Sequence, residues 1–305
     1  MYWKNKKITL TGGSGFLGSF IYEKLIKLGV SKKDIFVPRS SCYDLRTKEA
    51  CHDVCEDKNI VIHLAANVGG IGYNQKYPGS LFYDNIMMCT NMMEEARKAG
   101  VEKYTAVGTI CAYPKYTPVP FKEEDLWSGY PEETNAPYGL SKKMQLVQAQ
   151  AYRQQYNFNS IFLLPVNLYG PRDEFNPKRS HVIPALIRKF TESKESVTVW
   201  GTGKATREFL YVEDAAEGII LATEKYNKSE PVNIGSGMEI SIKNLVKTIS
   251  ELTDFKGDIL WDKTKPDGQP RRMLDVSKAE KEFGFKAKTT LEEGLKKTVN
   301  WWKEQ

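Results

Sequence analysis

A tyrosine and a lysine four residues apart, Tyr138 and Lys142, are the pair of residues whose chemistry organises the interpretation of this sequence. On a helix this spacing puts both side chains on one face, one turn apart. A phenol titrates near ~10, and a neighbouring ammonium favours the phenolate, which brings proton transfer closer to neutral pH. Many helices carry such a pair as an ordinary solvated face. The surrounding segments must decide between a surface pair and a proton-transfer unit.

A glycine-rich turn follows the first predicted strand. Residues 7–11 are typical of a short strand, and 19–28 have helical periodicity that stops at Gly29. When a glycine turn joins a strand to a helix, a pyrophosphate can approach the free N–H groups of the helix N-terminus. The alternative interpretation is a tight turn that binds no ligand. The predicted cofactor contacts are Gly12, Gly13, Ser14, Gly15, Phe16, Leu17 and Gly18.

The segment after the second predicted strand, 34–37, bears on the choice of cofactor. An NAD site favours an acid there, bonded to the ribose 2′-hydroxyl. This chain has Arg39 and Ser40 instead, and both suit a 2′-phosphate. The sequence therefore favours NADP(H), with a solvated loop charge as the alternative interpretation of Arg39.

Strands and helices alternate along the first half of the sequence. Further strands are predicted at 59–64, 103–107 and 160–164, and helices at 79–99 and 138–156. This alternation predicts an α/β fold, a Rossmann-type doubly wound parallel sheet whose ligands bind outside the carboxyl ends of the strands.

The character of the sequence changes after Pro171, where short strands and helices follow polar loops. We interpret residues 1–166 as the NADP-binding domain, with part of 202–230 returning to it. Residues 167–305 are interpreted as mainly a smaller α/β lobe that binds the substrate, with a cleft between the two.

Composition excludes several classes of protein. The chain has 305 residues, 41% hydrophobic and 27% charged, and its net charge of +6 is scattered without a long basic block, so no nucleic-acid partner is expected. No apolar run is long enough to span a bilayer, so no membrane association is expected. The five cysteines lack the spacing of a disulfide framework or of a complete metal site, which favours a reducing, cytoplasmic compartment and no metal.

Together these motifs resemble the extended short-chain dehydrogenase/reductase family. The match is carried by Thr11–Gly18, Thr109, the Tyr138/Lys142 pair and 207–212. Within that family the chain is similar to the GDP-L-fucose synthase group over nearly its whole length. That similarity rests on Val-Gly-Gly-Ile at 68–71, Cys111-x-Tyr-Pro, and the motifs at 167–171, 180–187, 199–203 and 265–268.

The resemblance implies an activity with named residues. The group converts GDP-4-keto-6-deoxy-D-mannose to GDP-L-fucose, by epimerising C3 and C5 and reducing C4 with NADPH. It implies Cys111 as base, His181 as acid, and Thr109 and Tyr138 as partners of the C4 oxygen. Lys142 is then expected to hold the cofactor ribose and to tune Tyr138.

The resemblance also implies binding residues and an assembly. The further cofactor contacts are Tyr138, Lys142, Val107, Gly108, Pro165, Asn167, Leu168 and His181, and the substrate contacts are Lys189, Trp200, Arg207 and Asp267. The nucleotide-diphosphate sugar is the expected partner, and a homodimer through the helices at 79–99 and 138–156 is implied.

The chain departs from the group at three places. Ile110 stands where the group usually has a polar residue, and Gly13-Ser14 stands where it usually has His and Arg. Ala112 replaces the usual Ile. A single-function 4-keto reductase or epimerase on another nucleotide sugar, such as a GDP-heptose, therefore stays open. A 4,6-dehydratase is disfavoured because that subfamily places an acidic pair where Ile110 and Cys111 stand. A non-enzymatic NADP-sensing scaffold is the remaining alternative, although it has no need of the Tyr138/Lys142 pair.

Overall fold

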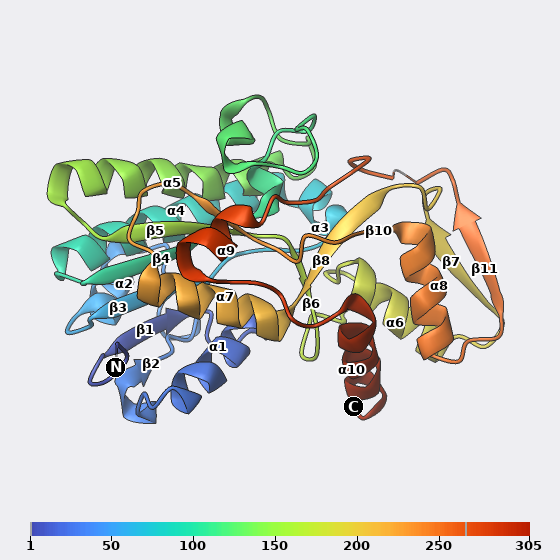
Figure 1. Cartoon of the computed structure of the whole chain (residues 1–305), viewed down its shortest axis with the longest axis horizontal. Helices are drawn as coiled ribbons and strands as arrows, with labels where there is room; N and C mark the ends of the chain where they lie inside the picture. Colours follow the sequence, from blue (N-terminus) through green and yellow to red (C-terminus); the bar gives the residue numbers. More distant parts are fainter. Residues whose placement is uncertain (1, 266) are drawn as a thin grey trace.

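Six parallel strands form the central sheet in this computed structural model, which describes residues 2–265 and 267–305 (Figure 1). Pro266, inside the 265–268 motif, lies outside the described residues. The strand order is β2-β1-β3-β4-β5-β9, and every neighbouring pair is parallel, so the predicted doubly wound sheet is confirmed. The strands are β1 Ile8–Thr11, β2 Ile35–Phe36, β3 Ile60–His63, β4 Lys103–Val107, β5 Ser160–Pro165 and β9 Val232–Ile234.

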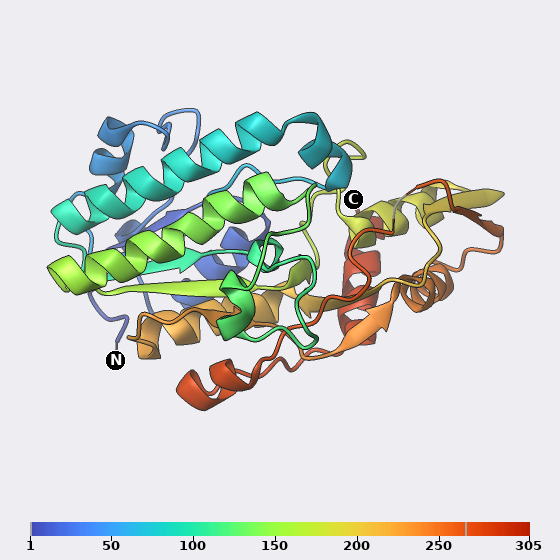
Figure 2. The same cartoon turned by 90° about the horizontal axis from the view of Figure 1, so that it is seen from above.

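Helices cover both faces of this sheet, which explains why β3, β4 and β5 are buried along their whole length. One face carries α1 (Phe16–Lys27) and α7 (Val212–Lys225). On the other face, α4 (Pro78–Lys98) and α5 (Ala136–Tyr156) lie side by side, and α2 (Lys48–Cys55) packs on α4 (Figure 2).

Strand β9 occupies a place that the sequence pattern did not predict. The interpretation of residues 167–305 as mainly the smaller lobe includes this segment, yet β9 pairs with β5 and completes the main sheet. Helix α9 (Ser277–Phe283) also returns to pack on α7 and β9. A strand of three residues carries a local signal for its conformation but none for the sheet that it joins, which explains the difference.

The second lobe contains two small sheets, visible beyond α7 in Figure 1. One has the order β10-β8-β6, built from Glu239–Ser241, Thr206–Tyr211 and Asn167–Tyr169. The other pairs β7 (Ser196–Trp200) with β11 (Asp258–Asp262) in parallel.

Three amphipathic helices enclose the separate core of this lobe: α6 Val182–Glu192, α8 Ile242–Leu252 and α10 Leu291–Lys303. The remaining helical segments are α3 Ile71–Lys76 and the short 3₁₀ turns η1 Lys32–Asp34, η2 Ile110–Ala112 and η3 Glu123–Trp127. No helix in the described ranges is long and apolar enough to cross a membrane.

Candidate active site

The glycine loop after β1 has the geometry of a site for an anionic group. Gly12 has φ +69°, and a β-carbon on Gly18 would lie 2.1 Å from the Gly12 carbonyl oxygen, so both positions require glycine. Helix α1 begins after Gly15 without a side-chain cap and has no acidic residue in its first turn. Its N–H groups are therefore free for a negatively charged ligand, and this loop fits the pyrophosphate of a dinucleotide.

The sheet order reverses between β1 and β3, and the loops that follow these strands touch at that point. The Thr11 hydroxyl oxygen accepts hydrogen bonds from the N–H groups of Leu64 and Ala65, each at 3.1 Å. Arg39 and Ser40 are exposed just after β2. The crevice at such a reversal is where doubly wound sheets bind nucleotides, so the residues present fit an NAD(P) cofactor.

The predicted catalytic residues Thr109, Cys111 and Tyr138 lie together where η2 meets the first turn of α5. Thr109 is the N-cap of η2, and its hydroxyl oxygen accepts the Cys111 N–H at 3.2 Å. A hydrogen bond with the Thr109 side chain lowers the pKa of Tyr138, but burial outweighs it and raises that pKa well above the usual value. The phenol is therefore held in its protonated form, ready to donate.

The side chain of Lys142 contacts α4, the helix beside the one that carries it. The lysine is 1% exposed, and its Nζ lies 3.6 Å from the Sγ atom of Cys89 in α4. The groups that shift the pKa of Tyr138 are Cys111, Cys89 and Thr109, besides burial, and Lys142 is not among them. A four-residue spacing fixes the shared helix face, whereas packing fixes where a long side chain ends.

The Cys111 thiol lies between an acceptor and a donor. It donates to Asn135 Oδ1 at 3.8 Å, and Arg272 Nη1 donates to its sulfur at 3.7 Å. Neither neighbour is among the site residues that the sequence motifs predict. Asn135 is three residues before Tyr138, so its position near the site could be predicted from the sequence. Arg272 is 161 residues from Cys111, and no local sequence pattern predicts their contact.

His181 is the N-cap residue of α6 and keeps contact with solvent. The surrounding protein desolvates the imidazole and lowers its pKa below the usual value. The segment before it is held by the loop after β3: Gly70 N–H donates to the Arg179 carbonyl at 3.1 Å, and the Arg179 guanidinium donates to the Val68 carbonyl at 3.1 Å. His181 is exposed and Cys111 is half-buried, so neither belongs to the packed interior.

The four predicted substrate residues gather around one end of β7. Trp200 ends that strand and is 54% exposed, and Lys189 Nζ donates to the Thr198 carbonyl at 2.8 Å. The Arg207 guanidinium donates to the Asp267 carbonyl at 3.1 Å. The Asp267 carboxylate in turn accepts the Thr202 N–H and hydroxyl, each at 2.7 Å, and so fixes the loop after β7.

The predicted cofactor contacts after β4 and β5 are tied into the sheet. Gly108 N–H donates to the Leu163 carbonyl at 2.7 Å, and a β-carbon at Gly108 would meet the Phe162 ring at 2.4 Å. Asn167 donates its side-chain amide to the Glu208 carbonyl at 2.9 Å. The other contacts expected in this region are Val107, Pro165 and Leu168, in β4, β5 and β6 respectively.

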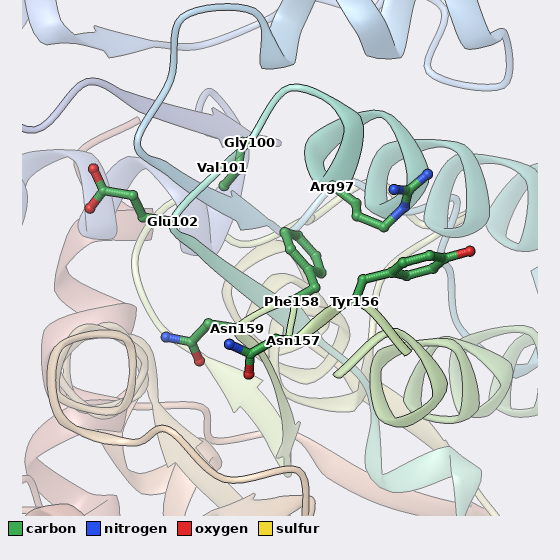
Figure 3. A pocket seen from close by; sticks show the side chains of 8 residues that line it. All are labelled: Arg97, Gly100, Val101, Glu102, Tyr156, Asn157, Phe158 and Asn159. Atoms are coloured by element: carbon green, nitrogen blue, oxygen red, sulfur yellow. The ribbon is translucent and has the colours of Figure 1, made fainter. Parts of the chain in front are cut away.

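A hollow of about 460 Å³ lies elsewhere on the molecule, between the ends of α4 and α5 (Figure 3). Glu102 and Asn159 on its wall directly precede β4 and β5, so the hollow lies at the amino ends of the strands. The glycine loop lies at their carboxyl ends. The Arg97 guanidinium covers the Tyr156 ring there at 4.2 Å. Within the described residues, no group of three or more His, Cys, Asp or Glu side chains could hold a metal ion.

The fold and the site together define a nucleotide-cofactor-dependent enzyme of the dehydrogenase and epimerase class. The chain belongs to the NAD dependent epimerase/dehydratase family, whose model matches residues 8–235. The resemblance to this class of NAD(P)-dependent enzymes is thus confirmed.

Relatives and solved structures match the whole chain. It is 41% identical to a probable GDP-L-fucose synthase 1 of Oryza sativa subsp. japonica, over 99% of this chain and 93% of the relative. A GDP-6-OMe-4-keto-L-xylo-heptose reductase from C. jejuni superposes with a TM-score of 0.93 at 27% identity, over 99% and 98% of the two chains. A GDP-L-fucose synthetase from Naegleria fowleri bound to NADP gives a TM-score of 0.87 at 28% identity, over 98% and 94%.

Proposed function

We propose that this enzyme is an NADPH-dependent 3,5-epimerase/4-reductase that converts GDP-4-keto-6-deoxy-D-mannose to GDP-L-fucose. The observation that carries the proposal is the half-buried Cys111 thiol beside the Thr109 and Tyr138 hydroxyls, because a plain reductase needs the hydroxyls but no thiol. The full-length similarity to a probable GDP-L-fucose synthase supports the same substrate.

Epimerisation uses groups on both faces of the sugar ring. The protons at C3 and C5 are acidic because the C4 ketone delocalises the negative charge. At each carbon in turn, Cys111 takes the proton from one face and His181 returns a proton to the opposite face, and both groups exchange protons with solvent between the two steps. Thr109 and Tyr138 donate hydrogen bonds to the C4 oxygen, where the charge of the enolate gathers.

Reduction uses the same oxygen. NADPH, when bound at the glycine loop, supplies the hydride for C4. Tyr138 gives its proton to the C4 oxygen, for which its protonated state is the required one. Lys142 is the residue proposed to hold the cofactor ribose. Arg39 and Ser40 are proposed to bind the 2′-phosphate and so to set the preference for NADP over NAD.

The second lobe holds the nucleotide in this proposal. Lys189 and Arg207 supply positive charge for the diphosphate, and Trp200 offers a flat, solvent-facing ring for the base or sugar. Asp267 keeps the adjoining loop and Arg207 in place through its hydrogen bonds.

A homodimer in a reducing compartment completes the proposal. Apolar side chains remain exposed on the paired helices α4 and α5, among them Phe82, Tyr83, Met144 and Val147. A second copy would cover this face. All five cysteines are free, which supports a cytoplasmic location.

The decisive experiment separates epimerisation from reduction. In Cys111→Ala, solvent deuterium should no longer enter C3 and C5 of the keto-sugar, while reduction of an already epimerised intermediate continues. Exchange at the wild-type rate in this variant would remove Cys111 from the mechanism. A panel of GDP-, UDP-, CDP- and dTDP-keto-sugars with NADPH and NADH, followed by nicotinamide absorbance and product NMR, identifies the substrate.

A single-function 4-keto reductase of a GDP-heptose is the second candidate. The TM-score of 0.93 to a GDP-heptose reductase favours it, as does buried Ile110 beside the catalytic threonine. In that case the wild-type enzyme reduces a GDP-4-keto-heptose and exchanges no ring protons before reduction.

A further inference from the structure

We propose that Arg272 is the positioning residue of Cys111: its guanidinium holds the sulfur in place and stabilises it in the negatively charged form that takes the substrate proton. This inference rests on the proposed epimerisation, in which Cys111 is the base. It adds a residue from the last quarter of the chain to a site otherwise built by η2 and α5.

The first support is the fixed position of the guanidinium. Arg272 Nη1 lies 3.7 Å from Cys111 Sγ, and Arg272 Nε donates to Gln269 Oε1 at 3.1 Å. Gln269 is itself anchored, because its side-chain amide donates to the Lys115 carbonyl at 2.7 Å. A guanidinium already held at Nε by Gln269 loses little conformational entropy when its Nη1 meets the sulfur.

The second support is the charge of Arg272. Its side chain is 8% exposed, and it forms no ion pair with a carboxylate in the described part of the chain. Its neighbour Arg271, by contrast, is bound to Glu239 at 2.6 Å. A sheltered cation without an acidic partner attracts a thiolate strongly, because little solvent screens the pair.

The third support is the backbone that carries Arg272. Its carbonyl accepts the Glu208 N–H at 3.0 Å, and the buried Glu208 carboxylate accepts the Leu274 N–H at 2.6 Å. The Met273 carbonyl accepts the Phe121 N–H at 2.8 Å. The segment is therefore held at Arg272 and at the two residues that follow it.

The sulfur has a suitable partner in each protonation state. As a thiolate it accepts from Arg272, and as a thiol it donates to Asn135 Oδ1. The amide of Asn135 cannot easily turn over, because its Nδ2 donates to Glu132 Oε2 at 2.5 Å. When the C–H bond breaks, its electron pair enters the enolate and the proton forms the S–H bond, while Arg272 stays a cation.

Other charged or titratable groups also face this sulfur. Arg207 comes from β8, and Tyr138 comes from α5. Burial, assisted by the charge of Arg272, lowers the pKa of Arg207 to about 10, while Asp267, Cys111 and Glu132 act in the opposite direction. Arg207 therefore stays charged at neutral pH and adds to the field of Arg272.

Alkylation of the free enzyme measures the proposal directly. Wild type, Arg272→Met, Arg272→Lys and the control Arg271→Met are treated with iodoacetamide from pH 5 to 10, and mass spectrometry follows the peptide that carries Cys111. At neutral pH, alkylation of Cys111 should be at least about tenfold slower in Arg272→Met, because the cation that attracts the thiolate is gone. Arg272→Lys should recover most of that change, and Arg271→Met should match wild type.

Deuterium exchange at C3 and C5 is the second readout and should slow at least about tenfold in Arg272→Met. An unchanged alkylation profile together with a raised KM alone would overturn the proposal and leave Arg272 as a diphosphate contact. If Arg272→Met does not fold, Gln269→Leu, which releases the guanidinium, is judged by the same two results. If the proposed function itself is wrong, the result differs from both of these. The wild-type enzyme then exchanges no protons at C3 and C5, although Arg272→Met still changes the alkylation of Cys111.

Discussion

The carbonyl oxygen of Cys111 faces Gly139 so closely that a β-carbon at position 139 would stand 2.2 Å from it. This contact joins η2 to the first turn of α5 and brings Tyr138 beside Thr109. Gly139→Ala should therefore push the two segments apart. Because overpacking costs about 1–3 kcal/mol, we expect a lower urea midpoint and a loss of most reductase activity.

Gly79→Ala is the matched control for that substitution. Gly79 also lies in the first turn of a helix, but a β-carbon there meets nothing within 4 Å. It should leave activity unchanged and the stability equal or slightly higher. Equal activity in the two variants would show that the close contact does not position Tyr138.

Tyr138→Phe removes the proposed proton donor without removing the ring. Reduction should fall by about 10²- to 10⁴-fold, the range for loss of a general acid. NADPH binding, measured by nicotinamide fluorescence, should change little. Tyr156→Phe, at the far end of α5, serves as the control. Near-normal reduction by Tyr138→Phe would assign the proton to another group.

Arg39→Ala tests the cofactor preference. Charge-assisted hydrogen bonds contribute about 1.5–3 kcal/mol, so kcat/KM with NADPH should fall roughly 10- to 100-fold. The value with NADH should stay the same, since NADH lacks the 2′-phosphate. Lys33→Ala, an exposed cation before β2, should affect neither. Equal losses with both cofactors would argue against a 2′-phosphate contact.

His63 should make stability depend on pH. The Thr11 hydroxyl donates to His63 Nδ1 at 2.8 Å, since its oxygen already accepts two backbone N–H groups. Burial, with a contribution from Lys142, lowers the pKa of His63 well below its usual value. The native state then stays unprotonated where the unfolded chain takes a proton, below about pH 6.5.

Stability therefore falls as pH drops below that point, by about 1.4 kcal/mol per pH unit for one proton. His63→Gln should be less stable than wild type at pH 8, and the gap should narrow toward pH 5. Urea unfolding at several pH values measures it. A gap that does not vary with pH would mean that His63 titrates normally in the native state.

Asp173 should make stability depend on pH in the direction opposite to His63. Burial raises the pKa of its carboxyl to about 7, and its Oδ2 atom has no hydrogen-bond partner among the described residues. The native state holds a proton that the unfolded chain releases near ~3.9, so ionisation destabilises the fold as pH rises toward 7. Asp173→Asn should gain stability relative to wild type between pH 4 and 7, and then level off. A constant difference across that range would contradict the assignment.

The glycine loop and the sheet were predictable because their signals are local. A strand, a glycine turn and a helix follow one another within 28 residues, and hydrophobic periodicity reports each element. Long-range packing decides the rest. The place of β9, the turn of Lys142 toward Cys89 and the arrival of Arg272 at Cys111 all join distant segments, so no window of sequence contains them.

The last strand of the central sheet, β9, comes after about half of the second lobe in the chain, because β6, α6, β7 and β8 precede it. During synthesis the edge of β5 stays unpaired until about residue 234, the end of β9, has left the ribosome. In that interval the unpaired edge can join another nascent chain. Fragments that stop before β9 should therefore aggregate, and expression of the nucleotide-binding half alone requires that β9 be supplied with it.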